Sequence, residues 1–244
     1  MKKFADLHLR PDLNNKHQTE KVLSKASELG FKIVGISLPP NVRQNMVDFL
    51  QQISTNCGVD FCTRIDLVPK SSGELLKSLR KFRRKFVLVA VQCSSKSIAR
   101  QAAKDHRVDL LVFPSIDPHE RFFDNAEARL ASESFAALEI DIAPLLRCAG
   151  FSRARLLSSL RKEVATAARI GVPVVICSGA VDWYQLRGPY ESASLAMLFG
   201  MQSPAALSAV SFAPSIIVER NRKKLDSTYV ARGIRIIRRR GNCD

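Results

Sequence analysis

The residues best suited to chemistry stand near the start of the chain, in the segment Phe4-Ala5-Asp6-Leu7-His8-Leu9-Arg10-Pro11. This short, largely apolar segment predicts a β-strand over residues 4–9. In α/β barrels the active site forms where strands end at the C-terminal face, so Asp6, His8 and Arg10 are predicted to lie at such a site. A histidine can bind a metal ion there, but a guanidinium stays protonated and has no free acceptor. Arg10 would therefore place a positive charge where a metal ion would sit.

Other potential metal ligands are few, because the chain has only 4 histidines. His119 is predicted to lie in a loop that could face the barrel mouth. Glu139 and Asp141 stand two residues apart on a predicted strand, so both side chains point to the same side. A structural role is favoured for this pair, and the alternative is a metal-dependent phosphoesterase with His8, Glu139 and His119 as ligands. The chain has no Walker loop, no His-Glu-x-x-His motif and no Gly-x-Ser-x-Gly motif.

Basic residues outnumber acidic ones, with 38 lysines and arginines against 23 aspartates and glutamates and a net charge of +15. Such an excess favours a polyanionic partner, with nucleic acid ahead of an anionic membrane surface. No apolar run approaches the roughly 20 residues that a membrane-spanning helix needs. No apolar signal-peptide core follows Met1-Lys2-Lys3. We therefore predict a protein that binds nucleic acid, has no membrane partner, and is cytoplasmic, or nuclear if its source is eukaryotic.

Two clusters hold much of the positive charge, and both are predicted to contact RNA phosphates. The first follows a predicted helix, where its alternative is solvated charge that complements the helix C-terminus. The second lies near the C-terminus, where its alternative is a tail without any contact. The predicted RNA-binding residues are Arg80, Lys81, Arg83, Arg84, Lys85, Arg220, Arg222, Lys223, Lys224, Arg238, Arg239 and Arg240.

Short apolar runs alternate with helical patterns along the chain. Several of the runs are apolar on both faces, which is typical of parallel strands covered by helices. Strands are predicted over 4–9, 32–38, 60–67, 86–92, 109–113, 138–142 and 173–178. Helices are predicted over 16–29, 41–54, 72–84, 95–105, 120–132, 152–170 (with Ser152 as its cap), 189–201 and 204–225.

This strict alternation predicts an α/β fold, a TIM-type barrel of parallel strands with surrounding helices in seven or eight β-α units. A doubly wound sheet is less favoured because no Gly-x-Gly-x-x-Gly motif follows any strand. We expect one barrel domain over residues 1–225 and a basic C-terminal tail over 226–244.

The first motif resembles the Asp-Leu-His-x-His opening of the PHP phosphoesterases, whose histidines bind metals, with Arg10 in place of the second histidine. From about residue 4 to about residue 224, the order and spacing of several short segments resemble the thirty-kilodalton barrel-subunit family of ribonuclease P. The segments are Asp6-Leu7-His8, Asp109-Leu110-Leu111 with Phe113, Phe123-Asp124, Leu138-Glu139-Ile140, Ser178-Gly179-Ala180, Leu186-Arg187-Gly188-Pro189, Leu198-Phe199-Gly200-Met201, Val210-Ser211, Pro214 and Arg220-Asn221.

This resemblance implies a PHP-like barrel without a metal centre, in which Asp6, His8 and Arg10 are the vestige of a site. It also implies a pairing with a small α/β partner subunit, and membership of a ribonucleoprotein together with other ribonuclease P proteins. The pair would bind the ribonuclease P RNA and meet precursor tRNA indirectly. The RNA would remove the 5′ leader with its own Mg²⁺, so the polypeptide would hold no cofactor and no catalytic residue. A further alternative is a noncatalytic barrel that only tethers RNA.

Overall fold

Seven parallel strands form one sheet that follows the order of the chain. The computed structural model describes residues 3–231 and 234–236. Each strand pairs with the next one along the sequence, and each is joined to it through at least one helix, which is the arrangement the alternating pattern predicts. The strands are β1 (Phe4–Leu9), β2 (Phe31–Ser37), β3 (Asp60–Leu67), β4 (Leu88–Gln92), β5 (Leu110–Val112), β6 (Ala137–Asp141) and β7 (Val174–Cys177).

The sheet curls into a nearly closed barrel, with its seam between β7 and β1. A single bridge joins Leu9 to Ala180, and the backbone N–H of Arg10 donates to the Ala180 carbonyl at 2.8 Å. At the other end of β1, the N–H of Ala5 donates to the carbonyl of Val210 at 2.9 Å. Val210 belongs to a helical connection, so within the described residues helices take the place of an eighth strand.

Ten α-helices surround and cap the described barrel, and most lie where the sequence predicts them. Several begin at a capping side chain, as at Ser71, Ser95 and Asp124, each of which accepts from a backbone N–H in the first turn. The helices are α1 (Lys16–Glu28), α2 (Gln44–Asn56), α3 (Ser72–Phe82), α4 (Lys96–Lys104), α5 (Asn125–Ser134), α6 (Ala143–Arg147), α7 (Gly150–Ile170), α8 (Pro189–Met197), α9 (Ser203–Ala209) and α10 (Phe212–Leu225).

Two details of the predicted helices are wrong. Helix α7 begins at Gly150 with Ala149 as its cap, so Ser152 lies inside the helix and does not cap it. The predicted helix over 204–225 is two helices, because α9 ends at Ala209 and α10 begins at Phe212. Pro214 has no N–H and its ring conflicts with the carbonyl four residues earlier, so it fits the first turn of α10 but cannot continue α9.

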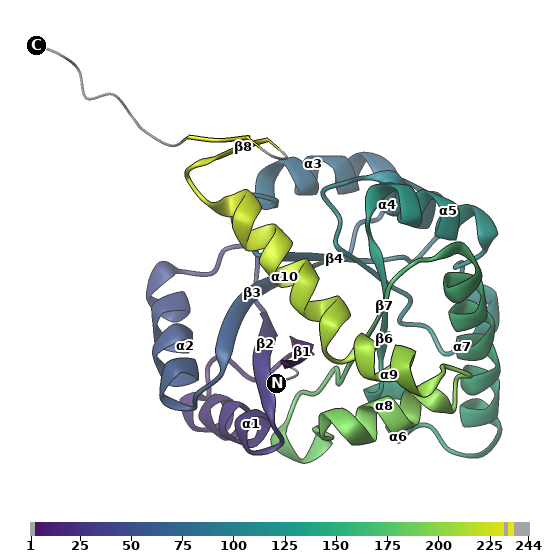
Figure 1. The fold of residues 1–244 in the computed structure, drawn as a ribbon, viewed down its shortest axis with the longest axis horizontal. Coiled ribbons are helices and arrows are strands. Elements are labelled where there is room, and N and C mark those ends of the chain that lie inside the picture. The colour runs from purple at the N-terminus through teal and green to yellow at the C-terminus, as the bar shows by residue number, and fades with distance from the viewer. Residues whose placement is uncertain (1–2, 232–233, 237–244) are drawn as a thin grey trace, which may run out of the picture.

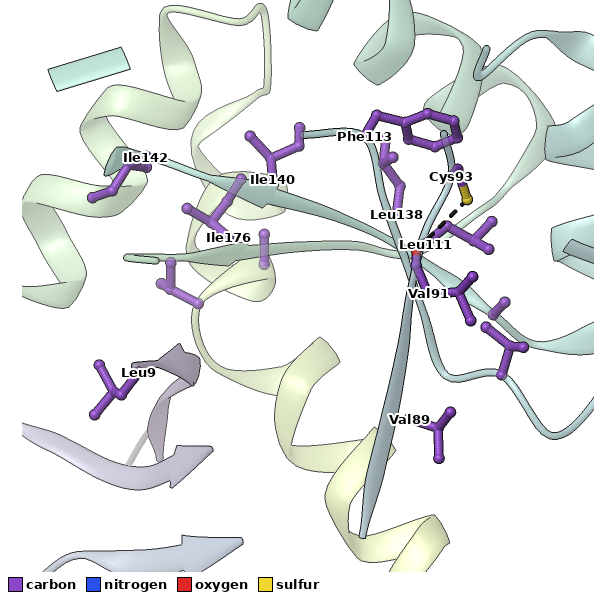
Figure 2. Close-up of a cluster of buried hydrophobic side chains, with 14 of the residues drawn as sticks. Leu9, Val89, Val91, Cys93, Leu111, Phe113, Leu138, Ile140, Ile142 and Ile176 are labelled. Carbon is purple, nitrogen blue, oxygen red and sulfur yellow. Dashed lines mark hydrogen bonds between the residues drawn. The ribbon is translucent and has the colours of Figure 1, made fainter. Parts of the chain in front are cut away.

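Outward-facing side chains of the strands form the larger part of the core. Figure 2 shows Val89 and Val91 of β4, Leu111 of β5, and Leu138 and Ile140 of β6 within this layer. All five are buried between the sheet and the surrounding helices. Burying side chains of this size is the main force that holds helices on a parallel sheet.

Helix α10 closes the N-terminal end of the barrel. It crosses in front of the strands in Figure 1, and its Ile217 and Val218 pack into the barrel interior against residues such as Leu7 and Leu88. Asn221, fully buried, donates from Nδ2 to the carbonyl of Val87 at 2.9 Å. The N-terminal half of the barrel interior is therefore apolar and closed to solvent. The polar interior side chains lie in the C-terminal half, toward the mouth.

An antiparallel hairpin of β8 (Tyr229–Ala231) and β9 (Ile234–Arg235) follows α10. Helix α10 ends at Leu225, where we expected the barrel to end, and the division into a barrel and a tail stays a prediction. Arg238, Arg239 and Arg240 lie outside the described residues. None of the helices that the structure describes is long and apolar enough to cross a membrane.

Gly35 is required by the close approach of β2 to β1. A Cβ atom at this position would lie 2.5 Å from the carbonyl oxygen of Leu7 and 2.9 Å from its carbonyl carbon. We expect Gly35→Ala to push β1 away and to lower the free energy of unfolding by about 2–3 kcal/mol, as overpacked cores do. Urea unfolding followed by circular dichroism measures the loss.

Gly73→Ala is the matched control for this substitution. Gly73 lies exposed in the first turn of α3, where the nearest atom to a new Cβ would be 4.0 Å away. Alanine there should leave stability unchanged or raise it by up to about 1 kcal/mol. An unfolding midpoint of Gly35→Ala equal to that of the wild type would contradict the close approach.

Candidate functional site

Charged side chains from three strands meet inside the C-terminal mouth of the barrel. Alternate residues of a strand face the same side, so Arg64 and Asp66 of β3 point inward together, as do Glu139 and Asp141 of β6. His8 reaches the same place from the end of β1. We call these five side chains the mouth cluster.

The Arg64 guanidinium lies at the centre of the mouth cluster and is fully buried. Its Nη1 is 2.9 Å from Oε1 of Glu139 and donates to the carbonyl of Leu7 at 2.9 Å. Its Nη2 and Nε donate to Oδ1 of Asp66 at 2.7 and 2.9 Å. The other oxygen of Asp66 accepts from the hydroxyl of Ser37 on β2. One cation therefore connects four strands of the barrel.

His8 is held between the carboxylates of β6. Its Nδ1 lies 2.9 Å from both carboxylate oxygens of Asp141 and 3.0 Å from Oε1 of Glu139. Burial and the Arg64 charge favour the neutral ring, but Asp141 and Glu139 outweigh them and raise the pKa of His8 to about 10. The ring is therefore an imidazolium at neutral pH and acts as a second buried cation.

The carboxylates respond to these cations according to their contacts. Burial would raise the pKa of Asp66, but Arg64 and His8 hold that pKa well below its usual range. Burial raises the pKa of Asp6 to about 6, although its hydrogen bonds and the charge of His8 act in the opposite direction. Its Oδ1 accepts from the backbone N–H groups of His8 and Ser178, both at 3.1 Å, and so supports the seam between β1 and β7.

Arg10 lies at the mouth of the barrel, as the sequence analysis expected, and lines a small pocket there together with His8, Glu139 and Asp141. Its side chain is exposed at the rim of the mouth, where Nη2 donates to the carbonyl of Gly179 at 3.1 Å. The positive charge in the place expected for a metal ion belongs to Arg64, which sequence reasoning missed. The signal was Arg64 with Asp66 two residues later on the same face of a predicted buried strand, because such a charge must be neutralised inside the barrel.

The remaining residues do not complete a hydrolytic metal centre. One ligand atom each of His8, Glu139 and Asp141 lies within 4.8 Å of the others, so this trio could hold an ion by distance alone. However, the His8 nitrogen nearest to the carboxylates is already engaged by them, and Arg64 contacts Glu139. His119, the third ligand of the phosphoesterase alternative, is exposed on the turn Pro118–Glu120. The geometry therefore gives that alternative no support.

The two predicted basic clusters meet at the N-terminal end of the barrel. Arg83, which follows α3, and Arg220 of α10 both pair with Asp109, at 2.6 and 2.9 Å. Burial lowers the pKa of Lys224, and the charges of Arg220 and Arg83 lower it further. The two clusters are far apart in sequence, but in the structure their side chains lie around the same carboxylate, that of Asp109. We call this region, from the end of α3 to the end of α10, the basic face.

The predicted RNA-binding residues divide into paired and unpaired groups. Arg83, Arg220 and Arg222 are half-buried, and Arg222 pairs with Asp60 through contacts of 2.6 and 2.7 Å. Ion pairs of this kind hold α10 and α3 on the barrel. The exposed residues of the two clusters, which can meet a ligand, are Arg80, Lys81, Arg84, Lys85, Lys223 and Lys224.

An apolar groove of about 1570 Å³ lies beside the basic face, between α7, α9 and α10. Phe135 and Phe212, both in its lining, are 57% and 66% exposed, and Ile216 is 43% exposed. Sequence reasoning missed this groove. The signal lay in α10 itself, which is apolar on two sides: Ile217 and Val218 enter the barrel, whereas Phe212 and Ile216 face the groove.

The model of one protein family, described as RNase P subunit p30, matches residues 3–226. This chain belongs to the RNase P subunit p30 family. Among the relatives of the family, ribonuclease P protein component 3 of Methanococcoides burtonii is 30% identical over 233 residues, which cover 96% of this chain and 93% of that protein. The resemblance inferred from the short segments is confirmed.

Solved structures agree with the barrel architecture of this family member. A chain in the cryo-EM structure of an archaeal ribonuclease P with mature tRNA has a TM-score of 0.84 at 23% identity, over 96% of this chain and 99% of that chain. A crystal structure of an amidohydrolase has a TM-score of 0.56 at 12% identity, over 91% of this chain and 75% of the other. The second likeness concerns the fold alone, and fold does not determine chemistry.

The charge of His8 should make the stability of this family member depend on pH. The pKa of about 10 in the folded chain lies above the ordinary 6.5, so the protonated ring stabilises the fold fully below pH 6.5 and loses this effect as pH rises toward 10. We expect His8→Gln to cost about 3 kcal/mol near pH 6, as the loss of one partner of a buried ion pair does. Urea unfolding at several pH values measures the gap between variant and wild type.

His17→Gln is the control, because His17 is exposed on α1. Its gap from the wild type should stay near zero across the same pH range. A gap for His8→Gln that stays constant, or widens as the pH rises, would show that the ring does not act as a buried cation.

Proposed function

We propose that this member of the RNase P subunit p30 family serves tRNA 5′-end maturation by binding the catalytic RNA of ribonuclease P through the basic face. The observation that carries the proposal is the meeting of the two basic clusters around Asp109. Arg83 and Arg220 share this one carboxylate, and burial and the charges of both arginines lower the pKa of the neighbouring Lys224, so positive charge is in excess here. Phosphates supply the missing negative charge, and their binding releases the counterions of the RNA.

The chemical step belongs to the RNA in this proposal. The interior position that barrel enzymes use for catalysis is filled here by Arg64 and His8, which are paired to carboxylates. We therefore assign no catalytic residue and no cofactor to the polypeptide, and we assign the Mg²⁺ of the reaction to the RNA. Precursor tRNA would be met through the RNA, and the protein would work in the cytoplasm together with the other ribonuclease P proteins.

The physical role that we propose is electrostatic. A catalytic RNA and a precursor tRNA repel each other, and at 0.1 M salt this repulsion is largely screened only between charges more than about 10 Å apart. A folded cationic surface reduces the repulsion between the two RNAs at a fixed place. It can also favour one RNA conformation over others. The exposed residues of the basic face are suited to this role because they are held on α3 and α10, two helices anchored to the barrel by ion pairs.

The basic face is tested by a triple substitution of exposed residues, Lys85→Ala, Lys223→Ala and Lys224→Ala. We expect the affinity for the ribonuclease P RNA of the same organism to fall about 10- to 100-fold at about 0.1 M salt, because three ammonium groups no longer neutralise phosphates. The slope of log affinity against log salt should decrease by about 1 for each phosphate that the variant no longer binds. Filter binding over a series of salt concentrations gives both quantities.

The matched control removes three positive charges from the other end of the barrel, at Arg43, Lys70 and Arg147. These residues are exposed on segments that follow the C-terminal ends of β2, β3 and β6. Equal losses of affinity for the two triple variants would mean that net charge alone acts and would contradict a specific face. If only deletion of residues 226–244 abolished binding, the chain would be a barrel that tethers RNA by its tail.

We further propose that the apolar groove receives a protein partner of the holoenzyme, the small α/β subunit implied by the family resemblance. The groove lining includes the exposed apolar side chains of Phe135, Phe212 and Ile216. RNA phosphates gain nothing from contact with such a surface, because it offers them no charge or hydrogen-bond donor. Arg161 and Lys223 stand at the groove and favour an occupant with acidic residues around an apolar contact. Buried aromatic side chains at the centre of such a contact typically carry most of the binding energy.

Phe212→Glu tests this assignment. A carboxylate at the groove floor would have to be buried on binding, so we expect at least a tenfold loss of affinity for the recombinant small subunit, or about 1.4 kcal/mol. Isothermal titration calorimetry measures the affinity. Phe151→Glu is the control, because Phe151 is 76% exposed on α7 and lies outside the groove lining. Unchanged affinity of Phe212→Glu would exclude the groove as the partner site.

A further inference from the structure

The mouth cluster places its buried carboxylates around one fully buried guanidinium. Asp66 and Glu139 both contact Arg64, Asp141 contacts His8, and the buried Asp6 lies beside them. Isolated carboxylates are not tolerated inside a protein, because the loss of hydration costs more than neighbouring dipoles return. The fold of the mouth therefore depends on a cation at this place.

Two atoms of the cluster have unused bonding capacity. Within the part of the chain that the structure describes, Oε2 of Glu139 and Nε2 of His8 are buried and have no hydrogen-bond partner. The Glu139 side chain has no exposed surface. A buried oxygen or nitrogen without a partner is unusual and is expected where a ligand could be bound. Together with the oxygens of Asp66 and Asp141, these atoms are the hard oxygen and imidazole donors that suit divalent ions such as Mn²⁺.

We propose that the mouth cluster is a divalent-cation site whose resident cation is the Arg64 guanidinium. In the wild type the guanidinium fills the site and excludes a metal ion, and shortening this side chain opens the site to one. Asp66, Glu139 and Asp141 are then ligands through their oxygens, and His8 is a ligand through Nε2, which releases its proton to the solvent as the ion binds while Nδ1 stays on Asp141. The inference is independent of the RNA-binding function proposed above, because it concerns the opposite end of the barrel.

The contacts of Arg64 explain why a metal ion is excluded. An ion bound by Glu139 and Asp66 would have to enter between them, where the guanidinium already contacts both, at 2.9 and 2.7 Å. A second positive charge at this distance would be strongly repelled in a buried environment. The guanidinium has one further property that a metal ion lacks: it offers no open ligand position and so cannot activate a water molecule. The substitution of a cation by a side chain would keep the barrel closed and remove the hydrolytic chemistry.

The experiment compares full-length Arg64→Ala with the wild type and with Arg121→Ala. Arg121 is the matched control, because its side chain is also buried and is paired to Glu163 at 2.6 and 2.7 Å, whereas its recorded ion pairs and hydrogen bonds within the described residues include no carboxylate of the mouth cluster. Thermal unfolding is followed in EDTA and in about 1 mM MnCl₂. Electron paramagnetic resonance measures the number of Mn²⁺ ions bound by each variant.

We expect both variants to melt below the wild type in EDTA. Mn²⁺ should raise the Tm of Arg64→Ala by about 5 °C or more, with one ion bound, because a ligand stabilises the folded state that binds it. The Tm values of the wild type and of Arg121→Ala should not change. Adding Glu139→Gln to Arg64→Ala should abolish the response to Mn²⁺.

Two results would overturn the proposal. The first is a stoichiometric Mn²⁺ ion in the wild type that is lost in His8→Ala, because the guanidinium would then not exclude a metal. The second is an Arg64→Ala chain whose stability does not respond to Mn²⁺. If Arg64→Ala is insoluble in EDTA, the same comparison is made by refolding with and without Mn²⁺, where recovery only with the ion supports the proposal and failure in both contradicts it.

Discussion

The structure depends on one buried guanidinium. Arg64 holds Asp66 on its own strand, Glu139 on β6 and the carbonyl of Leu7 on β1, and so links strands from opposite sides of the barrel. Removing one partner of such a pair leaves an uncompensated charge in the interior, which costs far more than the intact pair contributes. The burial of Asp66 and Glu139 therefore depends on the same cation, because each carboxylate needs the Arg64 guanidinium to offset its charge.

This constraint separates the two ends of the barrel. In the C-terminal mouth, where barrel enzymes bind their substrates, Arg64 and His8 are paired with carboxylates of β3 and β6. The N-terminal end is closed by α10, which places its apolar side chains inside the barrel and its basic side chains outside. Asp109 and Asp60 pair with the arginines that anchor α3 and α10, so the exposed lysines beside them are held in position without being neutralised. These arginines are thus engaged in ion pairs within the protein, whereas the exposed lysines beside them can bind a ligand.

The local patterns of the sequence were sufficient for the architecture. Runs such as Phe86–Gln92, apolar on both faces, identify buried parallel strands, and β1 and β3 have the predicted bounds. The site was harder, because its residues come from strands distant in sequence. Arg64 and Glu139 lie on β3 and β6, and no local pattern shows that their side chains meet. For the same reason, the basic clusters at Arg83 and Arg220 were recognised individually, but their common partner Asp109 was not.

The central cation of the mouth was missed because of the same limit. A motif read along one strand predicts a charge where that strand ends, and Arg10, which directly follows β1, does line the mouth. Across the sheet, however, the end of β1 lies beside Gly179, whose carbonyl accepts from Arg10 at the rim. The interior position beside His8 is occupied by a side chain of β3, which lies two strands away in the sheet. That side chain is Arg64. In a closed barrel the neighbours of an inward-facing side chain are set by strand order and register. The effect of changing a charge inside the barrel therefore depends on the side chains of the opposite strands, and the motif that contains the charge does not predict it.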